Sequence, residues 1–300
     1  MLAMTDYTIK PYNESYIEKQ VEIGTHFASK WIAYGQSSVE QVKEAYSRDT
    51  FDPDTRLYCF KGDEMVGYIG ANIVDVEEEK IKRAGSRLAF VLPGHEEAFD
   101  LLFNQLLGVL KEKEVSEIET PQTALNDNYY ELAEKLGFSK TRTVSDIFFC
   151  DTSKIKSYES DYTLVDYNHD TDAEQVAKQL GKTYPNLDGD NLTNYVNRMA
   201  TNENLLSYEV IKENDEILAY GASTATQNEG YAQISLLIGK GSDLKRTIIV
   251  ELLSKIKDAG FKQVLVFLNP QTPVEKEEME DFKAVGFEKV ASYDILTKKL

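Results

Sequence analysis

The stretch that decides the fold begins Leu88-Ala89-Phe90-Val91-Leu92-Pro93-Gly94 and continues to Leu110. A short apolar run that ends at Pro-Gly predicts a buried strand stopped by a turn. Apolar residues then recur at steps of three and four, which places them on one face of a helix. They are Phe99, Leu102, Phe103, Leu106, Leu107 and Leu110. The stretch therefore predicts a strand–turn–helix unit of an α/β domain.

The same pattern occurs a second time, without a gap, in the second half of the chain. Residues 234–238 form the second apolar run, and the helical stripe after it contains Ile248, Ile249, Leu252, Leu253 and Ile256. Three further segments repeat in the same order: Tyr7–Asn13 with Tyr162–Asn168, Asp63–Tyr68 with Asp215–Tyr220, and Gly137-Phe138 with Gly286-Phe287. Chance similarity rarely preserves order through four segments, so we infer an internal repeat.

The repeat predicts two domains that share one order of elements, β-α-α-β-β-β-α-β-α-β. We expect the first domain at residues 1–150, a polar linker at 151–161 and the second domain at 162–300. Each half should close with its own last strand, at residues 145–149 and 293–296. Because hairpins and helix crossovers both occur in this order, each copy should contain a mixed sheet. The expected fold class is α/β (α+β, with a mixed sheet).

Composition and charge exclude several classes of protein. The apolar fraction is 42%, which is enough for packed cores and excludes a disordered polyelectrolyte. The 51 acidic residues outnumber the 33 basic ones, and the net charge of −18 would repel nucleic acid. No stretch approaches the roughly 20 apolar residues of a membrane span, and the start lacks the apolar core of a signal peptide. We therefore expect a cytoplasmic protein that binds neither nucleic acid nor a membrane.

Metal and nucleotide motifs are absent from the sequence. Only Cys59 and Cys150 are present, and the three histidines lack metal-ligand spacing, so no metal is expected. The stretch Gly239–Ser242 lacks the spacing of a nucleotide-binding P-loop, which disfavours a phosphate-loop nucleotidase.

The end of each half carries a second recurring motif. Leu132-Ala133-Glu134-Lys135-Leu136-Gly137-Phe138 and Phe282-Lys283-Ala284-Val285-Gly286-Phe287 both end in Gly-Phe. With the strand–loop–helix segments from Leu88 and from Ile234, these ends resemble the GNAT N-acetyltransferase superfamily, and tandem GNAT proteins in particular. The resemblance covers nearly the whole chain, twice. It implies two tandem GNAT-like domains that use acetyl-coenzyme A as acyl donor and an amine as acceptor.

The resemblance places the diphosphate of coenzyme A at the loop between strand and helix, where unpaired backbone N–H groups attract phosphate. The family's Arg-Gly-x-Gly-x-Gly corresponds here to residues 240–245, preceded by Gly239 and followed by Arg246; with Gly239, the loop keeps two glycines, a serine and two lysines, and Asp243 adds an unfavourable negative charge. Asn269 either anchors the pantetheine arm or begins a turn with Pro270, and the cations are either phosphate ligands or a solvated surface. The expected cofactor-binding residues are Leu236, Leu237, Ile238, Gly239, Lys240, Gly241, Ser242, Lys245, Arg246 and Asn269.

The first half offers a poorer loop for a diphosphate. The matching residues are Gly94-His95-Glu96-Glu97, and two carboxylates there would repel phosphate. Like unit charges 4 Å apart repel by about 4 kcal/mol at an effective dielectric of about 20. Alternatively, Glu96 and Glu97 are ordinary acids in the first turn of a helix. We expect the second domain to bind the cofactor and the first to be a degenerate structural copy.

The resemblance also implies direct attack of the amine on the thioester, assisted by a general base and an acid. The family's acidic Tyr falls at Ala133 and Phe282, neither of which can donate a proton. Our catalytic candidates are Glu209 as base, Tyr220 as replacement acid and Ser235 where the strand should bend; Tyr231 and Tyr293 are alternative acids. Each candidate also has a purely structural interpretation. Glu209 would be a surface carboxylate, the tyrosines would be half-buried strand residues, and Ser235 would only tolerate the bend.

Two classes of function follow from these observations. The first is an acyl-CoA-dependent N-acetyltransferase with coenzyme A in the second domain. The second is a catalytically inactive GNAT pair that binds a ligand or partner, which the missing Tyr at Ala133 and Phe282 favours. A pocket for another acyl carrier is a third possibility. The sequence specifies neither the acceptor amine, the acyl chain nor the oligomeric state.

Overall fold

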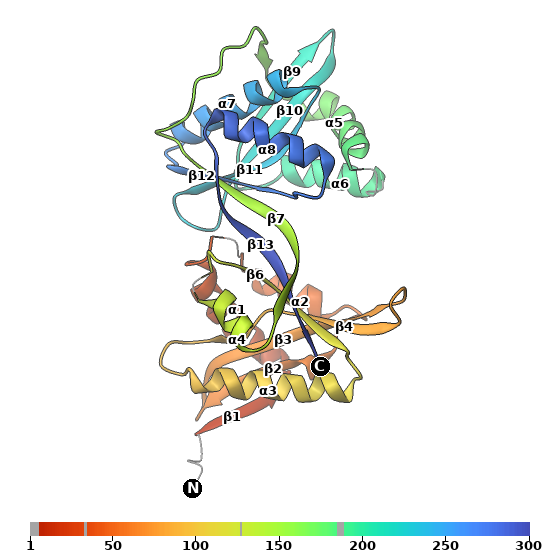
Figure 1. Ribbon diagram of the computed structural model, residues 1–300, viewed down its shortest axis with the longest axis vertical. Coiled ribbons are helices and arrows are strands. Elements are labelled where there is room, and N and C mark those ends of the chain that lie inside the picture. The colour runs from red at the N-terminus through yellow and green to blue at the C-terminus, as the bar shows by residue number, and fades with distance from the viewer. Residues whose placement is uncertain (1–5, 33–34, 127, 185–188) are drawn as a thin grey trace. The chain divides into compact units, whose positions relative to one another are not determined.

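The computed structural model describes residues 6–32, 35–126, 128–184 and 189–300, and in them places thirteen strands and eight α-helices (Figure 1). The chain divides into two units by its internal contacts. Unit 1 comprises Met1–Thr143 and Tyr293–Leu300, and unit 2 comprises Val144–Ser292. Among the described residues, no helix combines the length and the apolar character needed to cross a membrane.

Unit 1 has the strand order β1-β2-β3-β4-β6-β13, in which β4 and β6 are parallel and the other neighbours antiparallel. The strands are β1 Tyr7–Pro11, β2 Arg56–Lys61, β3 Glu64–Val76, β4 Ile81–Ser86, β5 Phe90–Val91, β6 Glu117–Thr123 and the end of β13 Glu288–Lys299. The helices are α1 Ile17–Ala28, α2 Val39–Tyr46, α3 Glu97–Glu112 and α4 Tyr129–Lys135. The short strand β5 continues the course of β4 and pairs with β3.

Unit 2 has the corresponding order β8-β9-β10-β11-β12-β7, with β11 and β12 parallel and the other neighbours antiparallel. The strands are β8 Leu164–Val165, β9 Leu205–Glu213, β10 Glu216–Ala225, β11 Tyr231–Gly239, β12 Gln263–Leu268 and the end of β7 Ser139–Asp151. The helices are α5 His169–Thr183, α6 Gly189–Ala200, α7 Ser242–Asp258 and α8 Pro273–Val285. The predicted mixed α/β fold and its repeated element order are confirmed.

The repeated Gly-Phe motif ends a helix in the same way in both units. Gly137 and Gly286 have φ of 85° and 116°, the left-handed region that glycine adopts without strain. The next residue, Phe138 or Phe287, donates its N–H back to a carbonyl of the preceding helix. Both phenylalanines are buried. The motif therefore turns the chain out of the helix and anchors it in the core.

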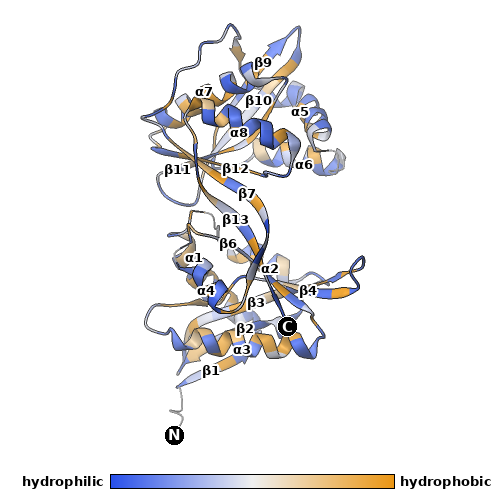
Figure 2. Cartoon of the chain, in the orientation of Figure 1, coloured by the Kyte–Doolittle hydropathy of each residue, from blue (hydrophilic) through white to orange (hydrophobic). Residues whose placement is uncertain are grey.

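The predicted apolar stripes on α3 and α7 face hydrophobic cores. On α7, the stripe from Ile248 to Ile256 is completely buried, and on α3 only Leu107 remains partly exposed. Figure 2 shows polar and apolar residues mixed along α3, as expected for a helix with one solvated face. In unit 2, one cluster packs beneath α7 and α8, and a second packs against α5 and α6. The sheet of unit 2 is therefore covered on both faces.

The expectation that each half closes with its own last strand is wrong. Residues 146–151 of β7 pair with 263–268 of β12, and residues 293–299 of β13 pair with 117–123 of β6. Each unit thus receives its last strand from the other half of the chain. The physical reason is that β6 and β12 are similar sheet edges, and either can take an antiparallel partner. The buried residues Phe148 and Leu296 lie in the cores of unit 2 and unit 1, respectively.

Candidate functional site

The candidate site in unit 2 lies where two parallel strands separate. The pairing between β11 and β12 ends at Gln233 and Leu265, although both strands continue beyond it. A small cavity of about 60 Å³ occupies the resulting gap. Its lining residues are Tyr184, Ile234, Ser235, Leu236, Leu237, Val266, Phe267, Leu268, Glu275, Glu278 and Phe282. Strand residues Ser235, Leu236 and Leu237 are therefore brought to this gap, as expected from the sequence.

Ser235 is the extra residue of a β-bulge. Ile234 pairs with Ser223 and Leu236 with Ala222, so Ser235 has no partner residue on β10. The bulge reverses the alternation of the strand, because Ile234 and Leu237 pack beneath α7 whereas Leu236 and Ile238 pack against α5 and α6. The Ser235 hydroxyl lies 2.7 Å from that of Thr224, and its carbonyl accepts from Tyr195 at 3.4 Å. Ser235 therefore forms the bend and also lines the cavity.

The loop from β11 into α7 has the backbone form of an anion-binding turn. Gly241 precedes the helix with φ 98° and ψ 162°, a conformation essentially restricted to glycine. No side chain caps the first N–H groups of α7. Gly239 lies against Lys245, since a Cβ atom added there would be 3.1 Å from Lys245 Cγ. Gly239, Gly241 and Ser242 thus form a tight turn whose helix start has no side-chain acceptor.

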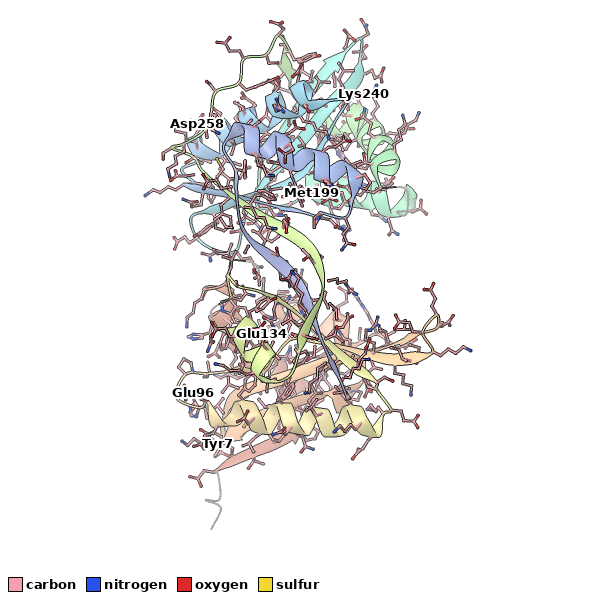
Figure 3. The ribbon with its side chains drawn as sticks, in the orientation of Figure 1. Tyr7, Glu96, Glu134, Met199, Lys240 and Asp258 are labelled. Carbon is pink, nitrogen blue, oxygen red and sulfur yellow. The ribbon has the colours of Figure 1, made fainter. Side chains whose placement is uncertain are left out.

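The three predicted cations differ in their availability. Lys240, labelled in Figure 3, pairs with Glu216 at 2.6 Å, and both side chains are more than half exposed. Such an exposed pair is worth at most about 1 kcal/mol and is easily exchanged for a ligand. Lys245 and Arg246 instead pair with the buried carboxylates Glu278 and Asp281 of α8, each at 3.0 Å. Of the three, Lys240 is the one that can bind a diphosphate without breaking an ion pair to a buried carboxylate.

The side chain of Asn269 belongs to a turn. Its Oδ1 accepts the N–H of Gln271 at 2.9 Å, and its own N–H donates to Glu275 at 2.6 Å. These bonds fix the chain around Pro270 as it leaves β12 and enters α8. Of the two interpretations of Asn269, the turn is the one that the geometry describes.

The catalytic candidates Glu209 and Tyr220 lie on opposite faces of the sheet. Glu209 is opposite Gly221, whose face packs on α7, whereas Tyr220 is opposite Val210 in the cluster against α5 and α6. Neither lines the cavity at Ser235. The three predicted catalytic residues are therefore not brought together.

Burial determines the protonation of the Tyr220 hydroxyl and the Glu209 carboxyl group. Tyr220 is 1% exposed, and burial raises its pKa far above the ordinary range, so it remains a neutral hydroxyl. Burial also raises the pKa of Glu209 to about 7, with a further contribution from Glu251 of α7. Glu209 is therefore a buried carboxyl and not the surface residue that alternation along the strand suggested.

Sequence reasoning missed the polar side chains that do line the cavity. Tyr184 follows α5, and Glu278 lies on α8 beside Lys245. Burial, with the nearby charges of Glu275 and Glu278, raises the pKa of the Tyr184 hydroxyl. Burial raises the pKa of Glu278 to about 7, although Lys245 opposes this effect. No local motif marks Tyr184, because only the fold brings the end of α5 to the gap.

Aromatic side chains fill one part of the corresponding gap in unit 1, and a cavity of about 530 Å³ adjoins that part. The pairing of β4 and β6 ends at Gly85 and Glu119, in the same relative place as in unit 2. Beyond it, Trp31, Phe90 and Tyr129 form an aromatic group, with Trp31 and Tyr129 rings 4.6 Å apart. The hollow that they border is too small to admit a water molecule.

The loop before α3 in unit 1 holds a carboxylate of the chain itself. Glu96, labelled in Figure 3, accepts the N–H of Gly94 at 2.9 Å. The hydrogen bond from Gly94 lowers the pKa of Glu96. A diphosphate at this place would compete with Glu96 and be repelled by it. Across the described ranges of the chain, no group of three or more His, Cys, Asp or Glu side chains is arranged to hold a metal ion.

Solved structures share this architecture over both units. A tandem GNAT protein from the clavulanic acid biosynthesis pathway matches with a TM-score of 0.66 at 10% identity, covering 98% of each chain. A GNAT-family acetyltransferase from Colwellia psychrerythraea matches with a TM-score of 0.63 at 13% identity, covering 98% of this chain and 99% of the other. A GCN5-related N-acetyltransferase from Sphaerobacter thermophilus matches with a TM-score of 0.58 at 12% identity, covering 98% and 96%.

Comparisons of sequence give no relative. No protein-family model matches the chain, and no curated protein is similar to it. At these low identities, the solved structures establish the architecture alone. On the repeated sheet order, the separated parallel strands in each unit and these structural matches, the chain has a tandem GNAT fold.

Proposed function

We propose that the chain is an acyl-CoA-dependent N-acetyltransferase whose unit 2 binds acetyl-CoA. The observation that carries the proposal is the difference in charge between the loops that lead into α3 and α7. Neither helix start has a side-chain cap, but in unit 1 the carboxylate of Glu96 accepts the N–H of Gly94 in the loop before α3, whereas the loop before α7 in unit 2 carries the exposed Lys240. An uncapped helix start with an available cation is suited to a diphosphate.

The remaining groups of the gap fit the chemistry of acyl transfer. The amine nitrogen attacks the thioester carbonyl, the C–S bond breaks, and the thiolate takes a proton. Tyr184 supplies that proton in our proposal, since it lines the gap and its raised pKa keeps it protonated. Glu275 and Glu278 are the carboxylates that can receive the proton of the amine, directly or through water.

Binding and turnover test the two parts of this proposal. Calorimetry should give one acetyl-CoA site per chain, and Lys240→Glu should weaken it about tenfold, equivalent to about 1.4 kcal/mol. Lys257→Glu makes the same charge change at the far end of α7 and should leave binding unchanged. Pantetheine lacks the diphosphate, so its weaker binding should not respond to Lys240→Glu. Absence of acetyl-CoA binding at millimolar concentration would refute the proposal.

Measurements of turnover distinguish the proposed proton donor, Tyr184, from the residues that bind acetyl-CoA. Tyr184→Phe should lower the release of coenzyme A with a panel of amines, while acetyl-CoA still binds with unchanged affinity. Equal turnover in Tyr184→Phe and the unaltered protein would exclude Tyr184 as the acid.

A second candidate function is a GNAT pair that binds a ligand without turnover. The cavity of about 60 Å³ favours it, because small-molecule pockets usually measure roughly 300–1,000 Å³ and a pantetheine arm requires the gap to widen. The phenylalanine at position 282 cannot donate a proton, which also favours this candidate. Saturable acetyl-CoA binding without release of coenzyme A to any amine would support it.

A further inference from the structure

We infer that unit 1 contains a binding site for a small organic carboxylate, with the Arg56 guanidinium as its principal ligand. The site is a cavity of about 530 Å³ that adjoins the closed hollow beside Trp31 and shares Arg87, Leu88, Phe90 and Pro121 with it. Its volume is within the usual range for small-molecule pockets. Helices α1 and α2, strands β2 to β4 and β6, and the end of β13 provide its walls, all within unit 1.

Arg56 is a buried cation that lacks a counter-charge. It begins β2 and is only 9% exposed. Its terminal nitrogens donate to the carbonyl oxygen of Ala71, to the Thr55 hydroxyl and to the side-chain oxygen of Asn72, all of which are neutral. Within residues 6–32, 35–126, 128–184 and 189–300, no carboxylate forms an ion pair with Arg56, and its hydrogen bonds come from the two terminal nitrogens. A buried charge without a partner is costly, so a bound anion would stabilise it.

The guanidinium is held in a fixed orientation. Its Cζ lies 5.3 Å from the ring centre of Tyr46 and 5.4 Å from that of Phe51, and these two rings stack at 4.4 Å. The stem of Arg56 packs on Gly70, where an added Cβ would lie 2.7 Å from Arg56 Cδ. A group fixed before the ligand arrives loses little conformational freedom on binding.

The charge of the cavity favours an anion even though the protein is acidic overall. Arg87 lines the cavity as a second guanidinium. The carboxylate of the lining residue Glu119 already pairs with Arg142 at 3.2 Å and with Arg83 at 3.5 Å, neither of which lines the cavity. The described lining therefore carries two guanidinium groups and one carboxylate that is already paired with Arg142, which leaves an excess of positive charge.

The geometry of the guanidinium N–H groups indicates which class of anion the cavity binds. A guanidinium presents parallel N–H groups that match the two oxygens of a planar carboxylate. Tyr46, Tyr68 and Phe90 also line the cavity and provide an apolar wall for the rest of the molecule. A carboxylate attached to an apolar or aromatic body therefore fits better than an inorganic ion.

The fluorescence of the single tryptophan gives a direct test. Trp31 is 2% exposed and lies 5.6 Å, ring to ring, from Phe90 of the cavity wall. Benzoate should change this fluorescence saturably, whereas benzamide, its neutral counterpart of the same shape, and inorganic phosphate should not. Arg56→Gln should weaken benzoate binding at least tenfold. Equal responses to benzoate and benzamide, or a response to phosphate alone, would overturn the carboxylate assignment.

A second substitution keeps the proposal testable if the Arg56→Gln variant does not fold. Ser37 is an exposed residue of the cavity lining, so Ser37→Glu adds a negative charge there without disturbing the core. Benzoate binding should weaken several-fold in Ser37→Glu and stay unchanged in the neutral control Ser37→Gln. Lys240→Glu should also leave it unchanged, which separates this site from acetyl-CoA binding in unit 2. Absence of a saturable benzoate response, or unchanged binding in both Arg56→Gln and Ser37→Glu, would refute the proposal.

Discussion

At the scale of single residues, two of the buried carboxyl groups of unit 2, Glu209 and Glu278, have different surroundings. Glu278 lies 3.0 Å from the ammonium group of Lys245, whereas burial beneath α7 determines the protonation of Glu209. Burial raises the pKa of each to about 7. Their different surroundings predict different responses to substitution.

Glu209→Gln should stabilise the protein at high pH only. Between the ordinary glutamate pKa of 4.5 and about 7, the unfolded chain releases this proton while the folded chain keeps it, so stability falls as pH rises. Removing the ionisable group should therefore raise the free energy of unfolding by about 2 kcal/mol at pH 8 and by little at pH 4.5. Urea unfolding at the two pH values measures the difference. Glu213→Gln, at an exposed end of the same strand, should show none.

Lys245→Met should destabilise the protein strongly at pH 8, because it leaves the Glu278 carboxylate buried without its partner. The expected loss is about 3–5 kcal/mol by urea unfolding. The double variant Lys245→Met/Glu278→Leu should recover most of it. Lys240→Met, which breaks the exposed pair with Glu216, should cost less than about 1 kcal/mol. A double variant as unstable as Lys245→Met alone would contradict a role for the pair.

Sequence reasoning located the loop residues but could not assign their partners. Gly239, Gly241 and Ser242 form the expected strand-to-helix turn, since glycine requirements are local. Lys245 and Arg246 could not be interpreted in the same way, because their carboxylates lie on α8, well beyond the helix that carries the cations. Of the three cations, Lys240 is the one whose side chain is mostly exposed.

At the scale of elements, α7 approaches β10 through a glycine. A Cβ atom at Gly221 would lie 2.4 Å from Ile248 Cγ2 and 2.9 Å from Leu252 Cδ1, both on α7. The register opposite Gly221 also explains why Glu209 is buried beneath this helix. Gly221 thus sets how closely α7 lies on the sheet.

Gly221→Ala should cost about 1–3 kcal/mol in unfolding free energy, because α7 must move or its side chains must change rotamer. Gly108→Ala is a suitable control, since Gly108 lies in the interior of α3 with no atom near its added Cβ. That change should stabilise the protein by up to about 1 kcal/mol through helix propensity. Thermal unfolding of both variants measures the contrast, and equal effects would contradict the close packing at Gly221.

Periodicity predicted the helices and strands well but could not place the bulge. The run at residues 234–238 is apolar on both sides, so its composition contains no alternation that a reversal at Ser235 would disturb. The bulge became visible only from the register with β10. The functional geometry of the gap therefore depends on a feature that the apolar pattern conceals.

At the scale of the whole molecule, unit 1 depends on the final residues of the chain. Leu296 is completely buried in the core of unit 1, although nearly all of that unit comes from the first half. Sequence reasoning recognised the strand at 293–296 but could not tell which sheet edge it joins, because the two edges are copies of one another. Strand pairing was thus the part of the fold that pattern alone could not determine.

Leu296→Ala should destabilise unit 1 by about 2–5 kcal/mol through the cavity that it leaves. The fluorescence of Trp31, which lies in the same core, should report the loss as a lower urea midpoint. Phe148→Ala removes a comparable side chain from the core of unit 2, although it comes from the first half of the sequence. It should lower the stability of unit 2 while shifting the Trp31 transition less than Leu296→Ala does. The opposite ranking would contradict the strand exchange.

The exchange of β7 and β13 also sets the order in which the units can be completed on the ribosome. Unit 2 has all its residues once Ser292 has been made, whereas unit 1 lacks its last strand until Leu300 is added. The part that is translated first is therefore the part that is finished last. Until β13 has been made, nascent unit 1 exposes the edge of β6, which makes it the more vulnerable unit to aggregation and proteolysis during synthesis.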